Sequence, residues 1–216
     1  MTATSIRITE IFFSLQGEAK TTGIPTVFVR LTGCPLRCQY CDTAYAFTGG
    51  TLESIEEILA QVDSYQTRYV TVTGGEPLAQ PACLDLLTAL CDAGYQVSLE
   101  TGGALDIAPV DPRVNIVLDL KTPGSGEMSR NLYANVGHLK PLDQVKFVIC
   151  DRQDYEWARF KVNELRLMDQ VDEVLFSASH DQLSSTDLAA WILEDRLPVR
   201  LQIQLHKYLW GDKPGV

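Results

Sequence analysis

The chain has 216 residues, of which 45% are hydrophobic and 21% are charged, enough apolar material for a large buried core. Its 18 basic and 28 acidic side chains give a net charge of −10, which argues against nucleic-acid binding because phosphates must be neutralised by Lys and Arg. No apolar run is long enough to span a bilayer, and the start of the sequence lacks the pattern of a secretory leader. We therefore expect a single domain over residues 1–216, located in the cytoplasm, that acts on small molecules or protein partners.

Alternating polar and apolar residues over 7–13 predict a first strand, and the β-branched run over 26–31 predicts a second. Strand and helix patterns then alternate along the chain. The other expected strands are 69–73, 95–99, 114–120, 144–149, 173–176 and 199–203, and the expected helices are 53–65, 81–93, 153–167 and 185–196. Residues 123–141 are expected to form a loop with one short helical piece. This order predicts an α/β fold with a mostly parallel sheet and right-handed crossovers, either open or curled into a partial β/α barrel.

Three of the six cysteines lie on one loop directly after the second strand, in the pattern Cys34-x3-Cys38-x2-Cys41. Three thiols this close in sequence indicate a shared metal centre more than a disulfide framework. Three ligands leave one coordination position open, as in catalytic metal sites. The remaining cysteines lie in apolar segments and are expected to pack as small hydrophobic side chains in a reducing compartment; they are Cys83, Cys91 and Cys150.

Polar or glycine-rich motifs follow four successive predicted strands. They are the cysteine loop, Thr73-Gly74-Gly75-Glu76-Pro77, Glu100-Thr101-Gly102-Gly103 and Lys121-Thr122-Pro123. Ligands of parallel sheets bind at the carboxyl ends of the strands. We therefore expect these motifs to line one site.

The cysteine spacing, Tyr40 before the last cysteine, and Gly-Gly-Glu-Pro after the next strand together resemble the radical S-adenosylmethionine (SAM) superfamily. The resemblance narrows to the 7-carboxy-7-deazaguanine synthase family and runs from residue 8 to the end. The motifs that narrow it are Leu15-Gln16-Gly17-Glu18, Cys41-Asp42-Thr43 and Gln204-Leu205-His206-Lys207.

This resemblance implies a lyase that converts 6-carboxy-5,6,7,8-tetrahydropterin to 7-carboxy-7-deazaguanine with release of ammonia, in the biosynthesis of queuosine and other 7-deazapurines. It also implies a partial, modified β/α barrel, and a 4Fe-4S cluster, SAM and Mg²⁺ as cofactors. A homodimer and an electron-donor protein such as a flavodoxin are the implied protein partners.

The resemblance implies a role for each residue of this chain that matches a motif of the family. The cluster ligands are Cys34, Cys38 and Cys41, and the implied Mg²⁺ ligand is Thr43. The expected SAM contacts are Tyr40, Cys41, Asp42, Gly74, Gly75, Glu76, Ser98 and Lys121, with Glu100 and Thr101 as weaker candidates for SAM or substrate. The expected substrate contacts are Leu15, Gln16, Gly17, Glu18, Arg30, Thr73, His206 and the terminal carboxylate of Val216. Arg30, Thr43 and His206 are the residues expected to matter most for catalysis.

The residue types support several of these roles on their own. Arg30 interrupts an apolar strand, and its planar fork suits a substrate carboxylate. Glycines allow the backbone to approach a ligand closely, and Glu76 can accept a hydrogen bond from the methionine ammonium of SAM. Lys121 departs from the pattern, since several relatives read Ser-Pro-Lys where this chain reads Leu120-Lys121-Thr122-Pro123.

The sequence is also compatible with ordinary structural explanations for these residues. Arg30 could lie on a solvated strand edge, Thr43 could cap a helix, and Gly74-Gly75 could form an ordinary turn. For the whole chain the alternatives are another radical SAM reaction such as glycyl-radical activation, an iron-sulfur electron carrier, or a zinc-binding module.

Overall fold

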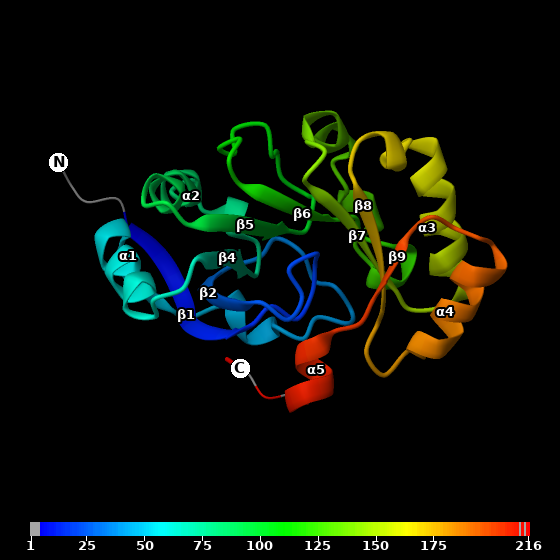
Figure 1. Cartoon of the computed structure of the whole chain (residues 1–216), viewed down its shortest axis with the longest axis horizontal. Coiled ribbons are helices and arrows are strands. Elements are labelled where there is room, and N and C mark those ends of the chain that lie inside the picture. The colour runs from blue at the N-terminus through cyan, green and yellow to red at the C-terminus, as the bar shows by residue number, and fades with distance from the viewer. Residues whose placement is uncertain (1–4, 212, 214) are drawn as a thin grey trace.

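The computed structural model describes residues 5–211, 213 and 215–216, and these form one nine-stranded sheet in the order β3-β1-β2-β4-β5-β6-β7-β8-β9. The strands are β1 (Ser5–Leu15), β2 (Pro25–Leu31), β3 (Thr51–Ser54), β4 (Tyr69–Gly74), β5 (Gln96–Thr101), β6 (Asn115–Asp119), β7 (Gln144–Ile149), β8 (Glu173–Ala178) and β9 (Arg200–Gln202). Strands β2 and β4 to β9 run parallel, whereas β1 is antiparallel to both β2 and β3. The sheet curves without closing, because β3 and β9 end it as separate edges (Figure 1). This is the partial barrel that the sequence predicts.

The helices are α1 (Ile55–Ser64), α2 (Cys83–Asp92), α3 (Arg152–Glu164), α4 (Ser185–Glu194) and α5 (Leu205–Trp210), and the short 3₁₀ turns are η1 (Ala44–Phe47), η2 (Pro77–Ala79), η3 (Pro123–Ser125), η4 (Met128–Arg130), η5 (Tyr133–His138) and η6 (Leu167–Asp169). Helices α1 to α4 contribute to one hydrophobic core with the sheet, for example through Ile58, Leu86, Tyr155 and Leu188. Helix α5 lies apart from these four, near the carboxyl terminus (Figure 1). None of the described helices is long and apolar enough to cross a membrane.

The two faces of the sheet differ sharply in polarity. On β7, Val145, Phe147 and Ile149 are fully buried in the core, while Lys146 points the other way. Parallel register aligns residues of the same face on neighbouring strands, as for Arg30 with Thr73 and Asp119 with Lys146. Because neighbours in register share a face, the polar residues collect on the inner side of the curve and the apolar residues contact the helices.

The expected strands and the four expected helices are present, and three local differences have physical explanations. Strand β3 was missed because it has only four residues and pairs antiparallel with β1 at an edge. The first helix begins at Ile55 and not at residue 53, because Ser54 and Glu57 form a capping box. The segment 123–141 holds three 3₁₀ turns where one helical piece was expected.

The aromatic cluster behind β7 should contribute strongly to stability. The ring of Phe147 is 5.5 Å from Phe176 and 6.2 Å from Trp157, both edge-on. We expect Phe147→Ala to lower the free energy of unfolding by about 3–5 kcal/mol, measured by denaturant unfolding. Phe160→Ala is the matched control, since this ring is 58% exposed and its loss should change stability by less than about 1 kcal/mol. Equal effects of the two changes would contradict this account of the core.

Candidate functional site

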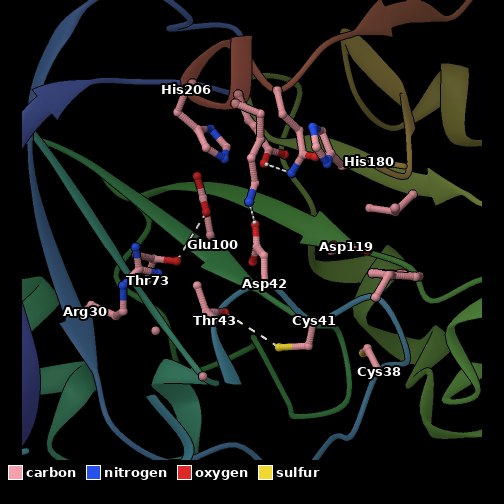
Figure 2. A pocket seen from close by; sticks show the side chains of 18 of the residues that line it. Arg30, Cys38, Cys41, Asp42, Thr43, Thr73, Glu100, Asp119, His180 and His206 are labelled. Atoms are coloured by element: carbon pink, nitrogen blue, oxygen red, sulfur yellow. Dashed lines mark hydrogen bonds and ion pairs between the residues drawn. The ribbon is translucent and has the colours of Figure 1, made fainter. Parts of the chain in front are cut away.

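A cavity of about 570 Å³ opens on the inner, polar face of the sheet, within the size range of small-molecule sites. The expected site residues that line it are Leu15, Gln16, Gly17, Glu18, Arg30, Cys34, Cys38, Tyr40, Cys41, Asp42, Thr43, Thr73, Gly74, Gly75, Lys121, His206 and Val216. Glu76 and Ser98 are the expected residues that do not line it. In Figure 2 the cysteine loop lies on one side of the cavity, with Cys38, Cys41 and Thr43, and the two histidines His180 and His206 lie on the opposite side.

The cysteine loop is held by backbone hydrogen bonds from three other segments. Gly33 N donates to Ala46 O at 2.8 Å, Glu76 N donates to Gly33 O at 2.8 Å, and Gln39 N donates to Ser125 O at 3.0 Å. These contacts fix both ends of the loop and turn all of its cysteines toward the cavity. The loop conformation is therefore a product of the surrounding fold.

The thiols fit a 4Fe-4S cluster. Burial raises the pKa of the Cys34 and Cys38 thiols, and the neighbouring thiols of the loop raise it further. Three thiolates at this place therefore need added positive charge, which bound iron supplies. Within the described residues no three His, Cys, Asp or Glu side chains converge as a single-ion site would require; in a 4Fe-4S cluster each cysteine binds a different iron.

Gly74 and Gly75 line the cavity and also pack tightly against neighbouring segments of the chain; their expected contact with SAM stays a prediction. A Cβ on Gly75 would lie 2.3 Å from Gly33 O and 2.8 Å from Cys34 Cβ, and a Cβ on Gly74 would lie 2.3 Å from Leu31 O. The glycines therefore allow the chain after β4 to pack directly against the start of the cysteine loop. Close approach to a ligand, the reason expected from the sequence, is not needed to explain them.

Glu76 and Ser98 do not line the cavity and make hydrogen bonds to other strands and loops; their expected contacts with SAM stay a prediction. Glu76 is fully buried and accepts hydrogen bonds from Thr101 Oγ1 at 2.9 Å and from Gly102 N at 2.7 Å. Burial raises the pKa of this carboxyl in spite of these donors. Ser98 Oγ lies 2.8 Å from Thr71 Oγ1 on the neighbouring strand. Glu76 connects the loop after β4 to the end of β5, and Ser98 connects the middle of β5 to the middle of β4.

Two of the carboxyl groups at the cavity, Glu18 and Glu100, lie in different environments. Burial opposes ionisation of Glu18, but the Lys146 ammonium, 2.7 Å away, lowers the pKa of Glu18 to about 2. Burial raises the pKa of Glu100, whose oxygens accept hydrogen bonds from Gln16 Nε2 at 3.3 Å and from Thr73 Oγ1 at 3.2 Å. Burial therefore acts on both groups, and only Glu18 has a nearby ammonium that outweighs its effect on the pKa.

Arg30 does not lie on a solvated strand edge. Its side chain is only 13% exposed, and its Nε donates to Glu10 Oε1 at 2.7 Å. The hydroxyl of Tyr45 donates to the same oxygen at 2.8 Å, and the guanidinium carbon lies 5.6 Å from the centre of the Phe12 ring and 5.9 Å from that of Tyr45. The guanidinium is therefore held in one orientation at the cavity wall.

Thr43 precedes the turn η1 as its N-cap residue, yet its side chain makes no capping hydrogen bond. Its hydroxyl instead lies 3.7 Å from Cys41 Sγ (Figure 2). The capping explanation that the sequence left open is therefore not supported. A hard oxygen remains beside the cysteine loop, at the cavity wall.

Two segments far apart in sequence meet at the roof of the cavity. Leu205 N donates to Gly17 O at 3.0 Å, and a Cβ on Gly17 would lie 2.3 Å from His206 Nδ1. The imidazole of His206 therefore packs against Gly17, which has no side chain to obstruct it. Burial lowers the pKa of His206, so the ring favours its neutral form. Val216, the last residue, also lines the cavity.

Sequence reasoning missed several cavity residues, among them Asp119, Lys146 and His180. Lys121 Nζ is 3.0 Å from Asp119 Oδ2 and 5.9 Å from the Tyr40 ring, which places Lys121 over the cysteine loop in spite of its unusual motif. Tyr40 OH and Asp119 Oδ1 are buried without a hydrogen-bond partner in the described part of the chain. In the sequence, the interruption of the apolar run 144–149 by a lysine was the one sign that Lys146 belongs to the site.

The packing of Gly75 gives a direct test of the loop. Gly75→Ala should displace Gly33 and Cys34, so the purified protein should lose most of its bound iron and sulfide and its visible iron-sulfur absorption. Gly137→Ala is the matched control, because nothing lies within 4 Å of the added Cβ and the backbone is ordinary there. Full cluster content in Gly75→Ala would show that the loop does not depend on this contact.

Comparisons with known proteins agree with this site. Residues 28–120 match the radical SAM superfamily. The 7-carboxy-7-deazaguanine synthase of Chlorobaculum tepidum is 43% identical, covering 100% of this chain and 99% of that protein, and the one of Koribacter versatilis is 44% identical, covering 95% and 97%. The crystal structure of QueE from Escherichia coli has a TM-score of 0.73 at 25% identity and covers 94% of this chain and 95% of that one. This chain therefore belongs to the 7-carboxy-7-deazaguanine synthase family of the radical SAM superfamily.

Proposed function

We propose that this chain is a lyase that converts 6-carboxy-5,6,7,8-tetrahydropterin to 7-carboxy-7-deazaguanine and ammonia. The observation that carries the proposal is that one cavity joins a three-cysteine loop to a fixed cation, Arg30, and to oriented polar groups, Gln16 and Glu18. The cation matches the carboxylate of the pterin, and the polar groups match its donor and acceptor edge. A simple electron carrier or a zinc module has no use for this second half of the cavity.

The cofactors are a 4Fe-4S cluster, which Cys34, Cys38 and Cys41 would hold, and SAM, as in the superfamily. When bound, they would supply reversible abstraction of a hydrogen atom from C6 of the substrate, with the hydrogen returned before the product leaves. The part of the protein is to position the substrate. Arg30 holds the substrate carboxylate through its terminal nitrogens, since Glu10 engages Nε. Gln16 and Glu18 hold the pyrimidine edge, and His206 covers the ring from the side opposite the cluster.

We assign Mg²⁺ to the hydroxyl of Thr43. Support comes from its place beside the cysteine loop and from the absence of a capping hydrogen bond. Magnesium takes hard oxygen ligands and keeps several waters, so one hydroxyl together with substrate oxygens is an adequate protein contribution.

We further propose that the enzyme acts as a homodimer and takes its electron from a small redox protein such as a flavodoxin. Exposed apolar side chains on α5 support a partner surface, since Tyr208 is 82% and Leu209 44% exposed. Beside the cysteine loop, exposed Arg37 offers positive charge to an acidic redox protein; its guanidinium donates to Cys34 O at 2.7 Å.

The decisive test is anaerobic reconstitution followed by product analysis. With SAM, a reductant and the carboxypterin, we expect 7-carboxy-7-deazaguanine and ammonia in equal amounts. 5′-deoxyadenosine should stay well below the product, because loss of ammonia is the only net change and the abstracted hydrogen must be returned. A tetrahydropterin without the carboxylate should give no ring-contracted product, because Arg30 loses its partner. SAM cleavage without product from the carboxypterin would instead favour another radical SAM reaction.

Thr43→Ala tests the magnesium site. The variant should keep its cluster and its cleavage of SAM without substrate, while kcat/KM for the carboxypterin falls at least about tenfold. Part of the loss should return with a divalent ion that binds water and carboxylate more strongly, such as Mn²⁺. Thr48→Ala, at an exposed position after η1, is the control, and loss of the cluster in Thr43→Ala would contradict the assignment.

A further inference from the structure

Lys146 is a buried cation in the middle of β7 with no role in the function described above. Its neighbours along the strand, Val145 and Phe147, are fully buried in the core behind the sheet. The lysine side chain is 11% exposed, lines the cavity and lies on the opposite face of the strand. A charge at such a position is costly unless it is paired.

The partners of Lys146 come from two segments far from it in sequence. Its Nζ lies 2.7 Å from Glu18 Oε2 and 3.6 Å from Asp119 Oδ2. The other oxygen of Glu18 accepts a hydrogen bond from Gln204 Nε2 at 3.2 Å, and Glu18 N donates to Gln16 Oε1 at 3.1 Å. The Glu18 carboxylate is thus held at both oxygens, and Lys146 is the cation that balances it.

A pterin presents two parallel donors on one edge, the N3–H and the 2-amino group. A carboxylate receives such a pair in bidentate fashion only when it is ionised and correctly turned. We propose that Lys146 is a positioning residue that keeps Glu18 ionised and oriented as the acceptor for this donor pair. The inference rests on the proposed function, because it takes the pterin as the substrate.

Among the charged groups around Glu18, Lys146 has the largest effect on the pKa of this carboxyl. The other groups that face this region are Asp119 on β6, Glu100 on β5, Arg30 on β2, Asp42 on the cysteine loop, and His206 and Lys207 on α5. Lys146 is the nearest cation to Glu18, and it lowers the pKa of Glu18 to about 2 against the effect of burial. Without it, the effect of burial would dominate and raise the pKa of Glu18 toward the assay range.

The experiment measures KM and kcat for the carboxypterin with the reconstituted holoenzyme, at saturating SAM and reductant, between about pH 6.5 and about pH 8.5. In the wild type Glu18 stays ionised throughout. In Lys146→Met we expect KM to rise at least about tenfold at the low end and to recover as pH rises, because each unit of pKa corresponds to a factor of ten. Lys146→Arg keeps the charge and should flatten the pH profile again.

Two measurements separate positioning from simple damage to the fold. Bound iron and sulfide should be retained in Lys146→Met, since the lysine pairs with Glu18 and Asp119 and not with a cysteine of the loop. Lys140→Met is the matched control, because it removes an ion pair of 2.9 Å to the buried Asp143 outside the cavity and should leave KM at the wild-type value.

A double-mutant comparison covers the case in which Lys146→Met does not fold. Glu18→Gln and Glu18→Gln/Lys146→Met should have the same raised KM, because Lys146 acts through Glu18. A further rise in the double variant would overturn the inference, as would a wild-type KM and pH profile in Lys146→Met. Absence of product from the wild-type enzyme would instead contradict the proposed function, so the two failures are distinguishable.

Discussion

The site depends on one tight backbone contact, in which Gly75 packs against Gly33 and Cys34. The space where a Cβ of Gly75 would lie is already filled by Gly33 O and Cys34 Cβ. This contact joins the end of β4 to the loop that follows β2, and Glu76 continues it to the loop after β5 through Thr101 and Gly102. The cysteines, the neighbouring Thr43 and the strand ends therefore occupy fixed relative positions before any ligand binds, which is the preorganisation that a radical reaction requires.

A second constraint is the separation of polar and apolar residues between the two faces of the sheet. The helix side is closed by an apolar core, so charged groups can only gather on the inner side. There they are partly buried, where charges interact strongly and must be balanced. Glu18 with Lys146 and Arg30 with Glu10 are such balanced pairs, at 2.7 Å each. No ion pair joins Glu100 to a cation among the described residues, and burial raises its pKa. One face thus offers carboxyl groups in different electrostatic environments to a ring with several donors and acceptors.

The carboxyl-terminal segment completes the cavity from the far end of the chain. Helix α5 is joined to the loop after β1 by the bond from Leu205 N to Gly17 O, and Val216 reaches the cavity lining. The loop after β1 and helix α5 therefore lie together, although almost the whole sheet lies between them in sequence. At this junction the imidazole of His206 packs on Gly17.

The sequence by itself determined the parallel α/β architecture, the cysteine loop and the strand ends that carry the site, because hydrophobic periodicity and motif spacing are local properties. It also placed Arg30, Gln16 and His206 at the cavity. The packing and hydrogen bonds of Gly74, Gly75, Glu76 and Ser98 became visible only in the folded chain, because their partners belong to other strands and loops. The same holds for Lys146, which looks like an irregularity in an apolar strand until folding brings Glu18 to 2.7 Å from it. Pairs of buried charges are long-range consequences of register and curvature, and no local pattern encodes them.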